Sequence, residues 1–191
     1  MPVALPGTHP PNQAGGSPSI GRMGIPEVDP TAGSPMLRHG ARLTGNKPGR
    51  WLARRVAPRI DRRLLRISRG RVSTAMVTPE LLLVTTGART GARRTTPLTY
   101  FTDGGRAVVV ASNYGSSRHP AWYYNVLAHP TVTISAGGHT GTFVGREVSG
   151  PERDRLWDLA TTFIPSYAQY EELAGSRTIP IVAFTPDPMT G

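Results

Sequence analysis

Short runs of aliphatic and β-branched residues, separated by turn-forming residues, dominate the second half of the chain. These runs predict six strands, at residues 80–86, 95–103, 106–112, 131–136, 140–148 and 179–185. Asp103-Gly104-Gly105 and Gly137-Gly138 stand between consecutive runs, and both predict tight hairpin turns. Because these connections are so short, we expect a mainly antiparallel sheet.

Two stretches between the strand-like runs have helical character. Residues 121–129 predict a short helix. A second helix is expected to begin after Ser149, which resembles a capping box with Glu152, and to reach about Leu173 with an interruption at Pro165. Six strands with few helices predict an α+β fold, a small antiparallel barrel with helices outside it.

The first third of the chain has a different pattern. Residues 1–47 are rich in proline, glycine and serine, lack periodicity and show no signal-peptide pattern, so we expect a disordered tail. Residues 49–69 repeat an aliphatic position every four residues among arginines, which predicts a basic amphipathic helix with a kink at Pro58. The predicted units are therefore a tail (1–47), a basic helix (48–71) and a barrel domain (72–191).

The net charge of +10 is concentrated in the basic segment. Residues 38–71 contain one acid, Asp61, whereas residues 72–191 are balanced. The basic helix is a candidate for contact with an anionic membrane surface, nucleic acid or an anionic ligand, and equally for packing on the barrel with a solvated basic face. The neutral charge of residues 72–191 argues against nucleic-acid binding by the barrel, which leaves only the helix for it, and we expect no nucleic-acid partner. With no apolar run long enough to span a membrane, we expect a cytoplasmic protein, with residues 49–69 as a candidate peripheral contact with the inner face of the cell membrane.

Several kinds of active site are excluded. The chain has no cysteine, which removes thiol nucleophiles and cysteine-ligated metals. It has no P-loop, no dinucleotide-binding glycine motif and no nucleophile elbow. Its five histidines lack metal-ligand spacing, so no metal is expected.

Three clusters carry the candidate chemistry. The loop at 85–95 combines glycines, threonines and three arginines. We expect glycine N–H groups to turn toward a ligand, beside hydroxyl and guanidinium donors that suit phosphate oxygens. Residues 111–125 join small polar residues to three consecutive aromatics, of which at least one should line a cavity or the surface. In the third cluster, Tyr167 and Tyr170 follow Pro165 and should share a helix face. Each cluster alone also fits a purely structural role.

Together, in this order, the clusters resemble the deazaflavin-dependent nitroreductase family of actinobacteria, which uses coenzyme F420. The resemblance runs from about Gly49 to Pro186 and is carried by LLLVTTGARTGARRTTPLTYFTDGGRAVVVASNYG, HPAWYYN, PSYAQY and RTIPIVAF. It implies a split β-barrel and an F420H2-dependent oxidoreductase that passes a hydride to an apolar electrophile such as a quinone, enone or nitroaromatic.

The resemblance also implies roles for matched positions. Those implied to hold the phosphate and acidic tail of F420 are Ala88, Arg89, Thr90 and Arg94. Those implied to form a strand wall beside the cofactor are Thr95, Thr96, Pro97, Leu98 and Thr99. Those implied to enclose the deazaflavin ring are Val110, Ala111, Ser112, Asn113, Ala121, Trp122, Tyr123, Tyr124 and Asn125. Those implied to contact the substrate at the catalytic centre are Ser112, Tyr167 and Tyr170, with Tyr167 also touching the cofactor.

Departures from the family pattern bear on the substrate. Ala88 replaces a usual basic residue, Asn113 a lysine and Ile164 a tyrosine, which favours a quinone or enone over a nitroimidazole. The proton could come from solvent, Ser112 or Tyr167. Alternatives are an FMN- or haem-binding protein of the same fold and a non-catalytic F420- or membrane-binding module. We expect a monomer or a loose homodimer.

Overall fold

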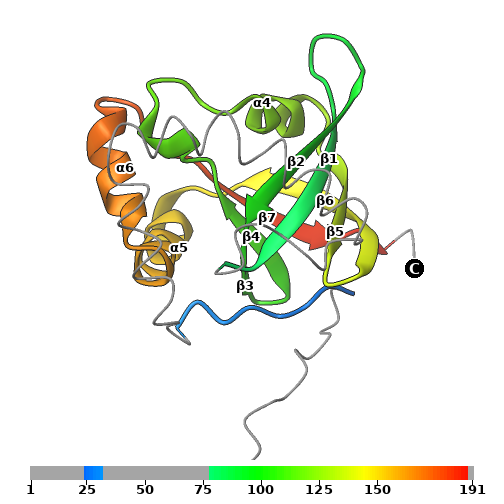
Figure 1. The fold of residues 1–191 in the computed structure, drawn as a ribbon, viewed down its shortest axis with the longest axis horizontal. Helices are drawn as coiled ribbons and strands as arrows, with labels where there is room; N and C mark the ends of the chain where they lie inside the picture. The colour runs from blue at the N-terminus through cyan, green and yellow to red at the C-terminus, as the bar shows by residue number, and fades with distance from the viewer. Residues whose placement is uncertain (1–23, 32–77, 189–191) are drawn as a thin grey trace, which may run out of the picture.

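The computed structural model describes residues 24–31 and 78–188 (Figure 1). Within these residues, one antiparallel sheet has the strand order β2-β1-β5-β6-β7-β4-β3. Its strands are β1 (Glu80–Thr86), β2 (Arg93–Thr99), β3 (Phe101–Asp103), β4 (Arg106–Val110), β5 (Thr131–Ala136), β6 (His139–Glu147) and β7 (Ile181–Pro186). Both predicted tight hairpins form, because Asp103 pairs with Arg106 and Ala136 with His139.

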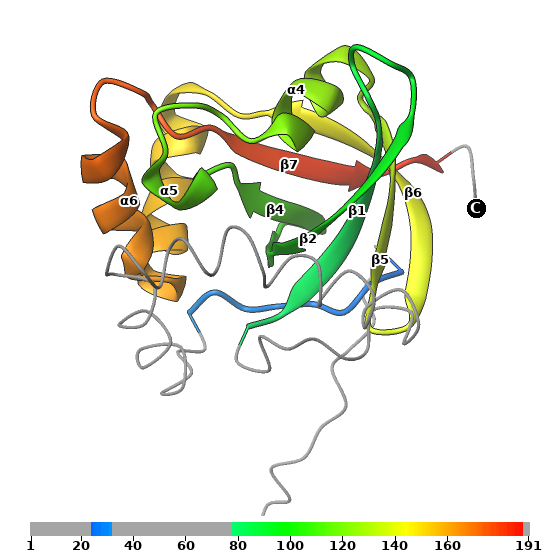
Figure 2. The same ribbon diagram turned by 45° about the horizontal axis from the view of Figure 1, so that its top comes forward.

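The sheet is curled into a split barrel (Figure 2). Its two edge strands, β2 and β3, are separated in the chain by Tyr100 alone, so the sheet has to bend round to bring its edges together. This confirms the predicted α+β split barrel. The single strand expected at 95–103 is instead two strands, because Tyr100 leaves the ladder: its N–H donates to the carbonyl of Pro79 and its hydroxyl to that of Pro26.

Strands β4 and β7 are buried on both faces, which explains their uninterrupted apolar sequences. Val109 and Val182 face the barrel interior, whereas Val108 and Ile181 face an outer core. Since side chains alternate along a strand, consecutive apolar residues supply two cores at once. The outer core lies under α5 (Gly150–Phe163) and α6 (Ser166–Ala174), which pack together at one side of the sheet (Figures 1 and 2).

Helix α4 (Ala121–Ala128) lies over the other end of the sheet, near the β1–β2 loop (Figure 1). Ser149 immediately precedes α5, as predicted, and is its N-cap residue. The predicted capping box is wrong, because the Ser149 side chain makes no capping hydrogen bond. The Glu152 carboxylate instead accepts hydrogen bonds from Arg106 at 2.6 Å and Arg146 at 3.1 Å. Pairing with two guanidiniums stabilises a carboxylate more than one backbone N–H does.

Residues 24–31 lie along the barrel, although disorder was expected throughout 1–47. Ile25 is fully buried in the inner core, and the Val28 N–H donates to the Thr102 hydroxyl at 2.9 Å. Burial of one isoleucine attaches this stretch to the barrel. The composition of the whole tail gives no sign of this contact, because a single apolar residue hardly changes it. The rest of the predicted tail and the predicted helix at 48–71 lie outside the described residues.

We expect a charged network at the β3–β4 hairpin to make stability depend on pH. Hydrogen bonds from Arg155, joined by those from Arg106, hold the pKa of Asp103 below its ordinary value of 3.8. Arg106 and then Arg146 lower the pKa of Glu152 from 4.5. A carboxyl group whose pKa is lower in the folded state stabilises the fold at pH values above its ordinary pKa. This stabilisation is lost as the pH falls through the folded-state pKa.

The measurement is the free energy of unfolding at pH 7 and pH 3. The protein should lose more stability between these values than its Asp103→Asn, Glu152→Gln variant. An equal loss in both proteins would show that the network does not contribute.

Candidate functional site

The β1–β2 hairpin presents a polar loop at one end of the barrel. Thr86 pairs with Arg93, so residues 87–92 form the loop. The Gly87 N–H donates to the Ala92 carbonyl at 2.9 Å and the Gly91 N–H to the Gly87 carbonyl at 2.8 Å. The expectation that the glycine N–H groups face a ligand is therefore wrong, since both close the loop on itself.

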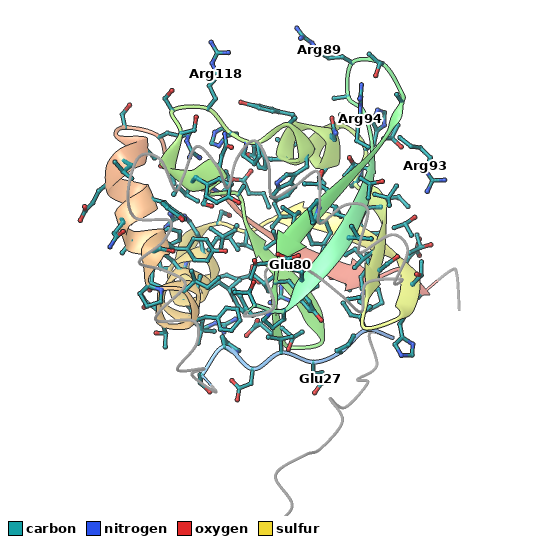
Figure 3. The ribbon with its side chains drawn as sticks, in the orientation of Figure 1. Glu27, Glu80, Arg89, Arg93, Arg94 and Arg118 are labelled. Carbon is teal, nitrogen blue, oxygen red and sulfur yellow. The ribbon has the colours of Figure 1, made fainter. Side chains whose placement is uncertain are left out.

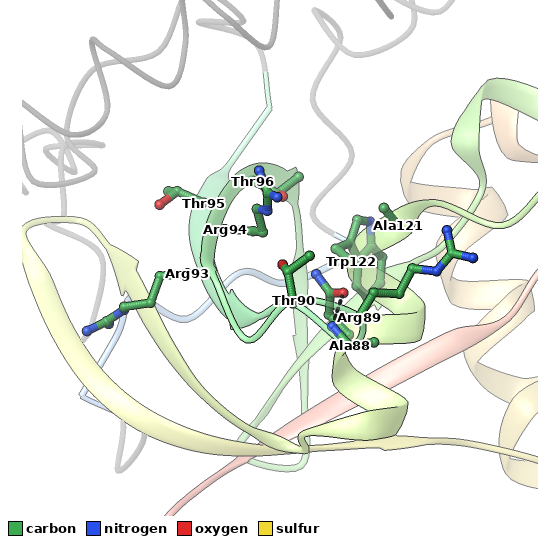
Figure 4. Close-up of a pocket in the computed structure, with 11 residues that line it drawn as sticks. Ala88, Arg89, Thr90, Arg93, Arg94, Thr95, Thr96, Ala121 and Trp122 are labelled. Carbon is green, nitrogen blue, oxygen red and sulfur yellow. Dashed lines mark hydrogen bonds between the residues drawn. The ribbon is translucent and has the colours of Figure 1, made fainter.

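Asn125 of α4 fixes this loop to the barrel. Its side-chain oxygen accepts from the Ala88 N–H and its amide nitrogen donates to the Thr85 hydroxyl, both at 3.0 Å (dashed line in Figure 4 for Ala88). Asn125 and Thr85 are buried. The amide thus positions the loop, a different task from the ring contact that the resemblance implied.

Loop, strand and helix surround a cavity of about 530 Å³. Its lining residues are Gly87, Ala88, Arg89, Thr90, Arg93, Arg94, Thr95, Thr96, Ala121, Trp122 and Asn125. Nine of the positions implied by the resemblance meet here, and Gly87 and Arg93 are added. The loop at 85–95 and the helical end of the second cluster therefore border one cavity.

The arginines of this site differ in direction (Figures 3 and 4). Arg93 and Arg94 are neighbours on β2, so they point to opposite sides of the hairpin. Arg94 lies on the Trp122 side, where the Arg89 side chain also extends, whereas Arg93 points away. None of the three pairs with a carboxylate of the described residues. Exposed guanidiniums without partners beside a cavity are suited to an anionic ligand.

The three consecutive aromatics of α4 have three environments, and the prediction that at least one lines a cavity or the surface is confirmed. Trp122 lines the cavity, Tyr124 is 49% exposed, and Tyr123 is buried with its hydroxyl donating to Glu147 at 2.6 Å. Burial, and next the bond to Glu147, raises the pKa of the Tyr123 phenol. Among the aromatic residues that the structure describes, only Trp122 lines the cavity.

The other residues implied to contact the cofactor do not line this cavity. Val110 packs in the outer core and Ala111 in the inner core. The Asn113 amide donates to the Arg118 carbonyl at 2.8 Å. On β2, Pro97, Leu98 and Thr99 lie beyond the cavity toward the middle of the barrel.

The residues implied to contact substrate gather around one turn. Ser112 begins the 3₁₀ turn η1 (Asn113–Gly115), and Tyr114 of that turn packs edge-on against Tyr170, with ring centroids 5.9 Å apart. Tyr167 and Tyr170 share a buried face of α6, as predicted, at 6.2 Å. Burial is the main reason that the pKa of Tyr167 is raised, so its hydroxyl stays protonated at neutral pH.

Sequence reasoning missed Arg177, the first residue of the RTIPIVAF stretch. Its guanidinium donates to the carbonyls of Ser112 and Ser116 at 2.7 and 2.8 Å. Both serines belong to the segment that leads into α4. The stretch was recognised, but nothing in its pattern indicates contacts with residues so distant in the chain.

The described ranges contain no group of His, Asp or Glu side chains that could hold a metal ion. In the same ranges, no helix is long and apolar enough to cross a membrane.

Replacing Asn125 with alanine should loosen the loop. We expect the free energy of unfolding to fall by about 1–3 kcal/mol, because the buried Thr85 hydroxyl and the Ala88 N–H both lose a partner. Ligand affinity at the cavity should fall with it. Thr85→Ala keeps the Ala88 bond and should cost less; equal effects of the two substitutions on affinity would contradict a positioning role for Asn125.

The fold and the cavity define a class: a split-barrel protein with a cationic and aromatic site for an anionic ligand that has a flat ring. Residues 57–186 match the family of F420H2-dependent quinone reductases. An F420H2-dependent quinone reductase of Mycobacterium tuberculosis (strain H37Rv) is 37% identical over 144 residues, which cover 71% of this chain and 96% of the relative.

Two solved structures are also similar. One, described as an F420-H2 dependent reductase, is 38% identical, covers 56% of this chain and 93% of its own, and has a TM-score of 0.51. Another, described as a domain-swapped dimer, is 32% identical, and the match covers 72% of this chain and 99% of its own. Its TM-score is 0.53.

The chain belongs to the F420H2-dependent quinone reductase family, a family of oxidoreductases whose cofactor is coenzyme F420. The predicted membership in an F420-dependent reductase family of actinobacteria is confirmed.

Proposed function

We propose that this protein binds reduced F420 at the β1–β2 loop and uses it to reduce an apolar electrophile, a quinone first of all. The proposal rests chiefly on one observation: Arg89 and Arg94 have no carboxylate partner among the described residues and reach toward the cavity that Trp122 lines. This donor set fits the cofactor, because a phosphate and an acidic tail need guanidiniums and a planar ring needs an aromatic wall.

Each group of residues then has a task. Arg89 and Arg94 bind the anionic part, with the Thr90 hydroxyl as an additional donor. Trp122 packs beside the ring, and Asn125 keeps the loop in register with α4. When bound, reduced F420 supplies a hydride from C5 of its deazaflavin ring. The protein contributes orientation and the exclusion of water.

The turn at 112–115 supports the substrate side of the proposal. Ser112 lies where β4 leads into this turn, and Tyr114 joins it to the tyrosines of α6. The Ser112 and Tyr167 hydroxyls are both candidate proton donors to the reduced product. A Tyr167→Phe variant with full activity would exclude the Tyr167 hydroxyl as an essential acid.

The direct test is oxidation of F420H2 by the full chain, followed by the recovery of F420 fluorescence. A soluble naphthoquinone should be reduced, an enone and a nitroaromatic compound serve as further acceptors, and reduced FMN should not replace F420H2. The proposal fails if no acceptor is reduced, or if reduced FMN serves equally well.

A membrane contact through residues 49–69 belongs to the same proposal. It is supported by the arginine-rich sequence and by the apolar nature of quinones. Deleting the N-terminal third would also remove the buried Ile25, so the better variant reverses charges at Arg54, Arg55, Arg62 and Arg63. Salt-sensitive binding to anionic liposomes should be lost in this variant; no binding by the unaltered protein at low salt would refute the contact.

We further propose a monomer or loose homodimer in solution. A molar mass from light scattering tests it, and a stable higher assembly would contradict it.

A further inference from the structure

Arg177 lies between α6 and β7 and contacts most of the segment that connects β4 to α4. Its guanidinium donates to the carbonyls of Ser112 (2.7 Å), Ser116 (2.8 Å) and, more weakly, Ala111 (3.4 Å). It also lies 3.1 Å from Nδ1 of His119. Among the described residues no carboxylate forms an ion pair with it. The partly buried Arg177 guanidinium thus makes all four of these contacts with neutral acceptors of one segment.

The segment that Arg177 contacts has an unfavourable backbone. Asn113 and Tyr114 both have left-handed φ angles, +48° and +54°, followed by Gly115 at +68°. Residues with a Cβ adopt this region only when their surroundings hold them there. Ser112 and Ser116 stand immediately before and after this run, so the guanidinium bonds to both ends of the turn.

The other side of the turn is held by close packing. A Cβ on Gly115 would come within 2.7 Å of the Leu173 Cβ on α6, so only glycine allows this approach. Helix α6 therefore supports the turn from one side and Arg177 ties its ends. Together they fix the backbone position of Ser112, and so the point from which its side chain extends.

His119 has to be neutral for the fourth contact. Arg177 can only donate, so the facing Nδ1 must accept. Burial lowers the pKa of His119, the nearby Arg177 lowers it further, and Glu147 acts in the opposite direction. The rings of Tyr123 and Tyr124 enclose the histidine at 5.0 and 5.8 Å. These surroundings favour the neutral acceptor at pH 7.

We propose that Arg177 is a positioning residue: it holds residues 111–119 in the shape that places Ser112 on the substrate side and, through the start of α4, Trp122 beside the deazaflavin ring. This inference rests on the proposed function, which assigns Ser112 and its neighbours to that side of the site. The geometry needs arginine, because the fixed fork of a guanidinium can bond to several carbonyls at once, whereas the compact ammonium of a lysine cannot.

The test compares Arg177→Gln and Arg177→Lys with Arg153→Gln. Arg153 is a matched control because its guanidinium also donates to a backbone carbonyl, that of Ile179 at 3.4 Å, and its side chain is 20% exposed. Its polar and cation–π contacts among the described residues are with α5, α6 and Ile179, away from residues 111–119. Dissociation constants are measured for F420 and for the deazaflavin core that lacks the phosphate tail, beside the melting temperature.

We expect Arg177→Gln to weaken binding of F420 and of the tail-less core by the same factor, about tenfold. Arg177→Lys should fold as the unaltered protein does and recover only part of this loss. Arg153→Gln should lower the melting temperature and leave both dissociation constants unchanged.

The inference is overturned if both Arg177 variants bind the core as tightly as the unaltered protein. It is also overturned if Arg153→Gln weakens binding to the same extent at an equal loss of melting temperature. Failure of the unaltered protein to bind either ligand would instead refute the proposed function, so the two failures are distinguishable.

Discussion

Replacing Arg89 and Arg94 together with alanine should weaken F420 binding by about 10²–10⁴-fold, the largest effect expected at the site. Each lost hydrogen bond to a charged group is worth about 1.5–3 kcal/mol. Both guanidiniums lack an ion-pair partner in the described part of the chain, so the substitutions break no ion pair there and stability should hardly change. The dissociation constant, measured by fluorescence titration, checks this.

Arg93→Ala is the matched control for that pair. It also borders the cavity and removes the same charge from the same hairpin, but its side chain points to the face of β2 away from Trp122. Binding should weaken less than in Arg94→Ala. If Arg93→Ala weakened binding as much as Arg94→Ala, the loop would act through its total charge, and the directional contact inferred from the strand alternation would be wrong.

Gly145→Val should destabilise the fold directly beneath the site. A Cβ at this position would come within 2.7 Å of both the Phe184 ring on β7 and a methyl group of Val126 on α4. Overpacking of this kind costs about 1–3 kcal/mol. Because α4 carries Trp122 and Asn125, the helix would have to move, and F420 affinity should fall together with stability.

Val144→Thr tests the cause of that loss. Val144 is the preceding residue on β6, and its side chain is 39% exposed on the opposite face. A substitution there should change the free energy of unfolding by less than about 0.5 kcal/mol. Chemical denaturation gives the free energy of unfolding of both variants. Equal destabilisation would show that any substitution in β6 is harmful, and not specifically one at the contact with α4.

Most of the sheet could be predicted from the sequence, because period-two patterns and glycine turns are local signals. The strands at 80–86 and 131–136 were predicted with the observed bounds. Tyr100 could not be recognised as a break, because its reason lies in contacts with Pro26 and Pro79. The buried Ile25 escaped detection in the same way, since a single anchor does not alter the composition of a long polar tail.

Individual clusters of the candidate site could be predicted, because each cluster lies within one segment. Arg89 and Arg94 of the loop and Trp122 of α4 line one cavity, and their roles in binding F420 stay predictions. The sequence could not show that the glycine N–H groups turn inward, or that the Asn125 amide bonds to the protein. These depend on partners brought together by folding. Arg177 is the clearest such case, because its partners precede it by more than fifty residues.

The most direct test of the central claim is a titration of the purified full chain with oxidised F420 and, separately, with FMN. Intrinsic tryptophan fluorescence should be quenched by F420, and Trp122→Phe should remove most of the quenching while F420 absorbance still reports binding. Micromolar or tighter binding of F420 without binding of FMN is the predicted result. Binding of FMN in preference to F420, or of neither, would contradict the account.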